Sequence, residues 1–164
     1  SSDNRGNVRV YERDASNTTI APFGWSQLGS DIDGEAGSDW SGYSVSMNSA
    51  GDRVAIGAYY NDGGPGSNGG HVRIYEYSSG SDSWTKLGSD IDGEAAGDQS
   101  GWSVSMNSAG DRVAIGAYYN DGGPGNDAGH VRIYEYSSGS DSWTKLGSDI
   151  DGEDGYDFSG WPVS

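Results

Sequence analysis

Short runs of alternating large and small side chains recur along the chain, and glycine-rich stretches separate them. In the segment 101–106, large apolar and small residues alternate with the period of two that is typical of a β-strand. The segment 112–118 is a second such run, and its small residues lie on one face, which would let a neighbouring sheet approach closely. Runs at 130–136 and 142–147 complete four predicted strands, and we expect no helix.

The stretches between these runs have the composition of turns and loops. Glycine and proline contribute 29 and 4 residues, and they are the strongest signals for interrupted secondary structure. Asn107 to Gly110 predicts a tight hairpin turn that ends in glycine, and the segment 120–125 predicts a loop. The segment 63–66 is too proline-rich for a phosphate-binding loop and precedes a strand instead of a helix, so it also predicts a plain loop.

The whole pattern repeats with a period of 59 residues. Residues 41–99 align without gaps on residues 100–158, and 51 of the 59 positions are identical. Residues 1–40 form a partial and divergent first repeat with two predicted strands and a five-residue insertion near Ser16–Thr19. Residues 159–164 correspond to the first strand of a further, truncated repeat.

Four antiparallel strands in each repeat is the pattern of a β-propeller blade. A blade buries its faces only against neighbouring blades, and two blades with a few extra strands are too few to close a ring. We therefore expect an all-β fold of tandem four-stranded antiparallel blades, in an open array that further repeats or other chains complete.

Composition excludes several classes of function. The chain has 25 acidic and 9 basic side chains, a formal net charge of −16 and no cysteine. We expect no nucleic-acid partner, since acidic proteins repel phosphate backbones, and no disulfide, thiolate nucleophile or zinc knuckle. No apolar run is long enough for a membrane helix and Ser1 does not open a signal peptide, so we expect no membrane insertion.

Three segments of each repeat resemble the FG-GAP repeat of integrin α-subunit heads, which also occurs in microbial and algal surface proteins. They are residues 41–46, 54–58 and 70–75. The resemblance implies a propeller blade with the first strand innermost, an extracellular or cell-surface location, and a role in adhesion or surface architecture. Ser41 and Ser100 replace the phenylalanine of the family motif, and Tyr59 and Tyr118 replace its final proline.

The sequence Asp-Ile-Asp-Gly-Glu occurs three times and is the candidate metal site. In an extended segment, acids at alternate positions share one face and could present oxygens to Ca²⁺. The alternative is that these carboxylates cap turns and keep an edge charged. The residues are Asp31, Asp33, Glu35, Asp90, Asp92, Glu94, Asp149, Asp151 and Glu153.

Paired carboxylates are also used in glycoside hydrolysis, but these acids recur in every repeat. Equal repetition favours structure or multivalent binding over catalysis, so we expect no enzyme. His71 and His130 occupy a position where the first repeat has Asn7, and we interpret them as polar strand residues.

Several aromatic residues are candidates for binding or assembly. Tyr59, Tyr60, Tyr118 and Tyr119 lie beside polar loops and could bind glycans, although packing between blades is the interpretation that we favour. The last segment departs from the repeat at Tyr156, Phe158 and Pro162, and with Trp161 these residues form a candidate assembly interface.

Asn17 opens an Asn-Thr-Thr glycosylation sequon inside the insertion.

We expect a non-enzymatic extracellular structural or adhesive protein that assembles blade on blade into a fibre, filament or ring. The alternatives are a lectin-like glycan-binding propeller module and a fragment of a longer integrin-like adhesion propeller. The expected partners are other copies of the chain, further repeats, or glycans, and Ca²⁺ is the one candidate cofactor.

Overall fold

The computed structural model describes residues 3–64, 66–123 and 125–164, and it confirms the all-β fold class. Pro65, in one predicted loop, and Pro124, in its counterpart, lie outside the described residues, as does Ser1. Among the described residues there is no helix long and apolar enough to cross a membrane. The strands are β1 (Asn7–Val8), β2 (Tyr11–Arg13), β3 (Trp25–Gln27), β4 (Ile32–Asp33), β5 (Ser44–Met47), β6 (Arg53–Ala58), β7 (His71–Ser78), β8 (Ser83–Lys86), β9 (Ile91–Asp92), β10 (Ser103–Met106), β11 (Arg112–Ala117), β12 (His130–Ser137), β13 (Ser142–Lys145) and β14 (Ile150–Asp151).

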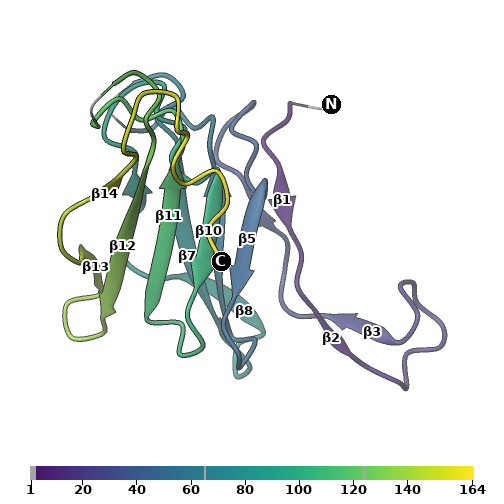
Figure 1. Ribbon diagram of the computed structural model, residues 1–164. Helices are drawn as coiled ribbons and strands as arrows, with labels where there is room; N and C mark the ends of the chain where they lie inside the picture. Colours follow the sequence, from purple (N-terminus) through teal and green to yellow (C-terminus); the bar gives the residue numbers. More distant parts are fainter. Residues whose placement is uncertain (1–2, 65, 124) are drawn as a thin grey trace.

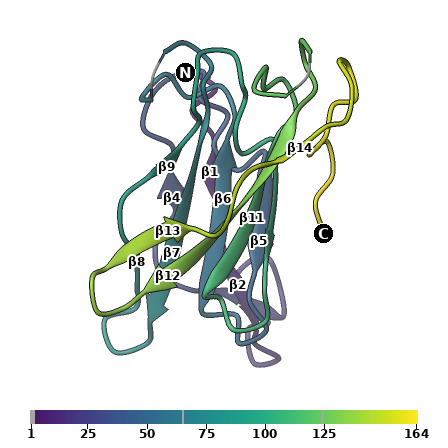
Figure 2. The ribbon, with the colours of Figure 1, turned by 60° about the vertical axis from the view of Figure 1, so that its left-hand side comes forward.

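These strands form two complete blades with the same topology. The first complete blade is the antiparallel sheet β5-β6-β7-β8, in which β9 also pairs with β7. The second complete blade is β10-β11-β12-β13, in which β14 pairs with β12. Figure 1 shows the two sheets side by side, with β1 at one end of the array and β12 to β14 of the second complete blade at the other, and Figure 2 shows the same sheets turned by 60°.

The outer edge of each blade differs from the expected single fourth strand. The long strand β7 pairs with β8 through Tyr75–Ser78 and with the two-residue strand β9 through His71 and Val72. The outer strand is therefore split by the loop between Lys86 and Ile91. The segment Ile91–Asp92 has no periodic run of its own, so the sequence pattern contained no signal for it.

The N-terminal strands β1 to β4 correspond to the outer half of a blade. β1 pairs with β4 and β2 pairs with β3, as β7 pairs with β9 and β8. This part of the chain has four short strands where two were expected, because residues 9–10 interrupt the first run and Ile32–Asp33 pairs separately. The hairpin of β2 and β3 projects away from the two blades (Figure 1).

The main hydrophobic core lies between the two complete blades. Both blades contribute to it, as expected for units that bury their faces against each other. Its buried members are Ala55, Val72, Ile74, Leu87, Ile91, Val104, Met106, Val113, Ile115 and Tyr134, with Tyr136 and Trp143 packed against them. A smaller core joins the first complete blade to the N-terminal strands, and it contains Ile32, Val54 and Ile56 with Val8, Tyr75 and Trp84 at its margin.

The second strand of each complete blade approaches the backbone of the next repeat so closely that only glycine fits at one position. A Cβ atom added to Gly57 would lie 2.1 Å from the carbonyl oxygen of Gly101, and one added to Gly116 would lie 2.1 Å from that of Gly160. The hydroxyl of Ser44 donates to the same Gly101 oxygen at 2.7 Å. This contact confirms the close approach that the small residues of the second strand predicted.

We expect Gly57→Ala to lower the free energy of unfolding by roughly 1–3 kcal/mol, because the added methyl group must push two backbones apart. Gly80→Ala is the matched control, since a Cβ there meets only the Ser78 hydroxyl oxygen, at 4.0 Å. Urea unfolding of both variants is the measurement. Equal stability of the two variants would contradict the tight inner contact.

Candidate functional site: the charged blade junctions and the aromatic edge

The same cluster of titratable side chains lies at both blade junctions. One cluster contains Glu35, His71 and Asp90, and ligand atoms of these three residues lie within 4.8 Å of one another. Glu35 follows β4, His71 begins β7 and Asp90 precedes β9, so the cluster combines two consecutive repeats. The second cluster, Glu94, His130 and Asp149, repeats this arrangement one blade further along.

Basic side chains already neutralise the carboxylates of the first cluster. Arg73 forms ion pairs with Glu35 and, at 2.7 Å, with Asp90. Lys86 contacts the other carboxylate oxygen of Asp90 at 2.5 Å. Burial works against ionisation of Asp90, but hydrogen bonds from Arg73 and Lys86 outweigh it and lower its pKa to about 2. The cluster is therefore an ion-pair network that ties two repeats together.

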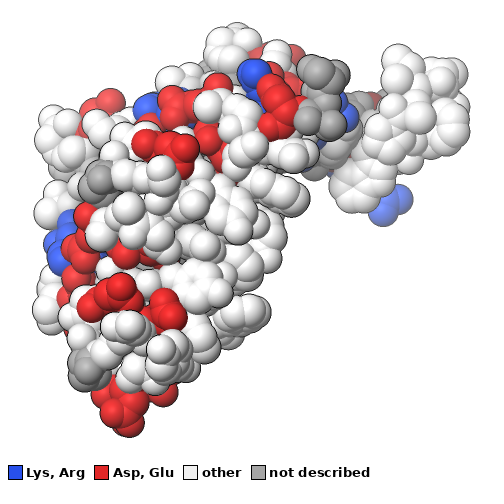
Figure 3. Space-filling model, turned by 90° about the horizontal axis from the view of Figure 1, so that it is seen from above, with Lys and Arg blue, Asp and Glu red and all other residues white. Residues whose placement is uncertain are grey.

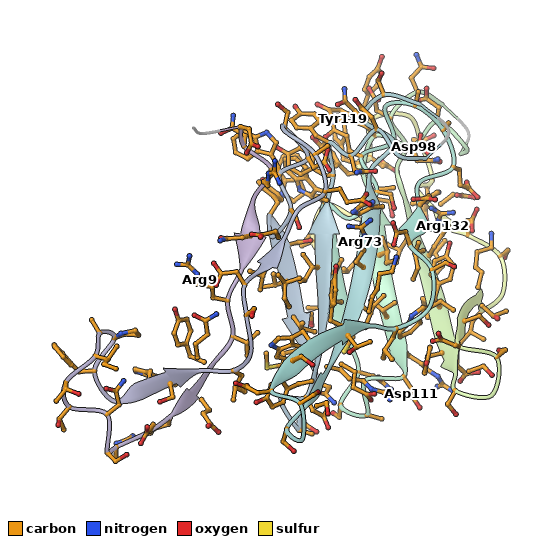
Figure 4. All side chains as sticks on the ribbon, turned by 180° about the vertical axis from the view of Figure 1, so that it is seen from behind. Arg9, Arg73, Asp98, Asp111, Tyr119 and Arg132 are labelled. Carbon is orange, nitrogen blue, oxygen red and sulfur yellow. The ribbon has the colours of Figure 1, made fainter. Side chains whose placement is uncertain are left out.

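The second cluster has the same residues but a different pairing. Arg132 lies 3.3 Å from Glu94 and donates to the backbone oxygen of Asp92 at 3.0 Å. Lys145 contacts Asp149 at 2.6 Å. Figure 4 labels Arg73 and Arg132, which lie between the sheets at corresponding places in the two repeats.

Each cluster contains a buried histidine. His130 is 1% exposed, and neither of its ring nitrogens has a hydrogen-bond partner among the described residues. Burial, and to a smaller extent the adjacent Arg132, lowers the pKa of His130, and burial with Arg73 does the same for His71. Both imidazoles are therefore neutral at pH 7. A neutral imidazole beside two carboxylates resembles a zinc ligand set, but here Arg and Lys occupy the carboxylates, so a cation would have to displace them.

The structure divides the acids of each Asp-Ile-Asp-Gly-Glu segment between two places. In the middle segment, Asp90 belongs to one junction cluster and Glu94 to the next, while Asp92 is exposed. Asp31 instead forms an ion pair with Arg9 at 2.7 Å. Asp33, Asp151 and Glu153 are exposed and belong to neither cluster among the described residues. Calcium binding by these acids stays a prediction.

Buried aspartate–asparagine pairs hold the loops of adjacent repeats together. Asn61 donates to Asp39 at 2.9 Å, and Asn120 donates to Asp98 at 2.9 Å. All four side chains are buried, and Figure 4 places Asp98 among the loops at the end of the sheets. The signal for this pairing was present in the repeated Asn-Asp-Gly loop, but only the fold shows that its partner is an aspartate 22 residues earlier.

A continuous series of packed aromatic rings runs along the same end of the molecule. We call it the aromatic edge. Neighbouring ring centroids lie 4.1–6.1 Å apart, and the members are Tyr43, Tyr59, Tyr60, Trp102, Tyr118, Tyr119, Phe158 and Trp161.

The aromatic edge has a buried layer and an exposed layer. Tyr59 and Tyr118 are buried and pack on Trp102 with centroid distances of 4.8 and 4.4 Å. Tyr60 is half-buried, whereas Tyr119 and Trp161 are exposed. Buried packing and exposed surface are thus both present among the four candidate tyrosines.

The candidate assembly residues near the C-terminus continue the aromatic edge. Trp161 packs on Tyr118 at 5.0 Å, in the way that Trp102 packs on Tyr59. Phe158 packs on Tyr119 at 5.9 Å. Tyr156 and Pro162 are exposed, and no strand is assigned to residues 159–164, although Ser159 bridges to Gly129.

Asn17, the candidate glycosylation residue, lies in the loop between β2 and β3. Its side-chain amide donates to the backbone oxygen of Trp25 at 2.6 Å, and its oxygen accepts from the backbone of Ile20 at 3.1 Å. Glycosylation of Asn17 stays a prediction. On the face seen in Figure 3, acidic side chains are scattered over the blade end of the molecule, and few are visible on the projecting N-terminal part.

Residues 90–134 match the FG-GAP repeat family. This segment is an FG-GAP-like repeat. The match runs from Asp90 to Tyr134, so it spans β9, β10 and β11 and the first five residues of β12. The resemblance seen in the sequence is therefore confirmed at the level of an FG-GAP-like repeat.

Comparison with solved structures supports the fold of this chain and shows no activity for it. No curated protein matches the sequence. A candidate 6-phosphogluconolactonase from Bacteroides fragilis NCTC 9343 has a similar structure, with a TM-score of 0.58 and 11% identity over 92% of this chain and 35% of that one. The periplasmic gluconolactonase PpgL of Pseudomonas aeruginosa has a TM-score of 0.43 and 10% identity over 85% of this chain and 37% of that one. This chain thus spans about a third of the length of these proteins.

These comparisons correct the expectation of a non-enzymatic structural or adhesive protein. The similar structure with a TM-score of 0.58 is named as a candidate 6-phosphogluconolactonase, which is an enzyme. Repetition of the carboxylates was therefore a poor argument against catalysis, because blades repeat for packing whatever site the assembled propeller carries. The lectin-like alternative rested on the paired tyrosines and the Asn-Asp-Gly loops, and the integrin-like alternative rested on the family resemblance. The similar structure, a candidate lactonase, supports neither alternative. At 11% identity the likeness shows the fold alone.

The lowered pKa of Asp90 predicts how stability depends on pH. The carboxylate stabilises the folded state above its ordinary pKa of 3.8, and this contribution is lost as the pH falls through about 2. At pH 6 we expect Asp90→Asn to cost about 2 kcal/mol of unfolding free energy, and the difference from the unsubstituted chain should shrink below pH 3.8. Urea unfolding between pH 6 and pH 2 measures it. The exposed Asp154→Asn is the control, and a difference that does not change with pH would contradict the ion-pair network.

Proposed function

We propose that this chain is a module of a larger β-propeller, to which it contributes two complete blades and the outer half of a third. The observation that carries the proposal is a comparison of equivalent residues. The side chains that are buried at the internal junction are exposed at the two outer faces of the chain. The fold and the FG-GAP repeat support the same conclusion, since blades are stable only against neighbours.

The outer face of the second complete blade lacks the cover that the first one has. Leu87 is 8% exposed and its equivalent Leu146 is 38% exposed, while Ile91 is 5% exposed and its equivalent Ile150 is 54% exposed. Leu87 and Ile91 belong to the main core. A further blade on this outer face would bury Leu146 and Ile150 in the same way.

Backbone groups on this outer face are also uncovered, although their equivalents at the internal junction are in contact with the next blade. At the internal junction, the indole of Trp143 donates to the backbone oxygen of Leu87 at 3.1 Å, and Asp141 accepts from the backbone of Gly88 at 2.9 Å. The equivalent glycine of the outer face, Gly147, has open space around the position of an added Cβ. The face is therefore shaped to receive a tryptophan and an aspartate from a further blade.

The opposite face, on the first complete blade, is also incompletely covered. Val104 is 7% exposed and its equivalent Val45 is 52% exposed, while Met106 is 9% exposed and its equivalent Met47 is 41% exposed. Isolated exposed apolar residues are ordinary, but contiguous apolar patches mark binding surfaces. Both faces therefore support a module that binds further blades.

We expect the chain to associate through its outer faces, and sedimentation equilibrium measures this against the monomer mass of 17.1 kDa. The double variant Leu146→Asp/Ile150→Asp should shift the average mass towards the monomer without lowering unfolding stability. The variant Asn126→Asp/Ser138→Asp adds the same charge at exposed positions elsewhere and is the control. A chain that stays monomeric at every concentration would contradict the proposal.

A second candidate is that the completed propeller binds and hydrolyses a sugar lactone at the aromatic edge. The likeness to a candidate 6-phosphogluconolactonase favours it, as do exposed rings beside carboxylates and amides, because flat apolar sugar faces pack on aromatic rings. Tyr119 and Trp161 provide the exposed rings of this edge.

Hydrolysis of gluconolactone, followed by acid release at constant pH, tests this second candidate. We expect a rate above that of buffer, and a drop of at least tenfold in Tyr119→Ser/Trp161→Ser. Phe23→Ser removes an exposed ring from the projecting hairpin and is the control. A rate equal to that of buffer would rule out this activity for the chain.

A further inference from the structure

An apolar groove lies between the N-terminal strands and the first strand of the first complete blade. Its volume is about 230 Å³. One wall comes from β1, β2 and the two residues between them, and the other from β5 and β6. The lining residues are Val8, Arg9, Val10, Tyr11, Val45, Ser46, Met47 and Val54.

One wall of this groove is an open strand edge. In the first complete blade, residues 71–76 of β7 pair with β6 on one side and with β8 and β9 on the other. The equivalent residues 7–12 pair with β3 and β4 on one side only. No described strand pairs with the other side. Such an edge is a template for strand addition.

The other wall shows what an occupant would have to cover. Val45 and Met47 are exposed here, whereas their equivalents Val104 and Met106 are buried in the main core together with Ala55 of β6. An occupant therefore needs a small residue like Ala55 on the strand that faces Val45 and Met47. A larger side chain would fill the space between the two sheets.

Polar contacts at the internal junction specify the occupant further. Ser44 donates to the carbonyl oxygen of Gly101 at 2.7 Å, and Ser46 accepts from the backbone of Met106 at 2.9 Å. Gly57 lies against the same Gly101 oxygen, where a Cβ would be 2.1 Å away. The junction thus requires two serines at alternate positions of one strand and a glycine on the other.

We propose that this groove binds the inner β-hairpin of another copy of the same repeat, with the sequence of residues 43–59. The proposal rests on the propeller module proposed above and names the segment that completes its third blade. The hairpin contains one Asp and one Arg and is neutral, so the acidic chain does not repel it. It supplies the two serines, the alanine and the glycine that the groove requires.

A synthetic peptide with the sequence of residues 43–59 tests the proposal in solution with the full chain. We expect saturable binding by fluorescence anisotropy, and hydrogen-exchange protection of the backbone amides of residues 7–12. The same peptide with Gly57→Val should bind at least tenfold more weakly, because the side chain would collide with a backbone oxygen. Saturable binding that leaves residues 7–12 unprotected would overturn the assignment of the groove.

Matched protein variants separate this groove from the opposite face. Val45→Asp/Met47→Asp should weaken peptide binding at least tenfold, whereas Leu146→Asp/Ile150→Asp should leave it unchanged. If the peptide does not bind and the fused hairpin described next does not stabilise the chain, while the chain still associates through Leu146 and Ile150, the groove proposal fails and the propeller module stands. If both variants weaken binding equally, the peptide is not recognised by the groove.

A fused hairpin covers the case in which the free peptide is too weakly structured to bind. Residues 41–64 placed directly before Ser1 continue the 59-residue register, since Ser1 is equivalent to Pro65. We expect the fusion to raise the unfolding temperature and to protect residues 7–12, and a fusion with the Gly57→Val substitution to do neither. Equal unfolding temperatures and exchange rates for the two fusions would overturn the proposal.

Discussion

Each sheet of this chain depends on the sheet beside it, because neither face of a blade is polar enough to be left in water. The main core is a junction between two blades and not the interior of either. The inner strands then approach until Gly57 touches the backbone of the next blade. The split outer strand, the junction clusters and the loop pairs are arranged around that contact. A blade removed from its neighbours would lose its core together with its register.

The charged clusters add a different kind of constraint to this packing. Apolar faces can slide, whereas the ion pairs of Arg73 with Glu35 and Asp90 connect defined atoms of two repeats. The buried pairs of Asn61 with Asp39 act in the same way at the loop end. Burying such polar and charged groups costs desolvation energy, and in return they fix how one repeat lies against the next. The ion pairs of the two junction clusters differ, so the repeat sequence allows more than one arrangement of ion pairs at a blade junction.

The sequence predicted the architecture well because its signals are local. Alternation in β10 and β11, and glycine at the hairpin turn, depend on neighbours along the chain. The two-residue strand β9 could not be predicted, because Ile91–Asp92 becomes a strand only through its pairing with His71 and Val72. The division of Asp90 and Glu94 between two junctions also depends on how blades stack. The function could not be predicted in the same way. Residues that recur in each repeat can do so because they pack one blade on the next, so their recurrence does not distinguish an enzyme from another kind of protein.

The near-identity of the two repeats has a consequence for how the chain folds. Because residues 41–99 and 100–158 share 51 positions, β6 matches the edge of β12 as well as that of its own partner β7. Only distance along the chain separates the two pairings, since β7 follows β6 after a short loop and β12 lies a full repeat later. Closing the shorter loop costs less entropy, so each hairpin should capture its own third strand first. Correct assembly of such an array thus depends on the order in which the strands pair as well as on their complementarity. If one blade closes slowly, the neighbouring blade can exchange strands with it.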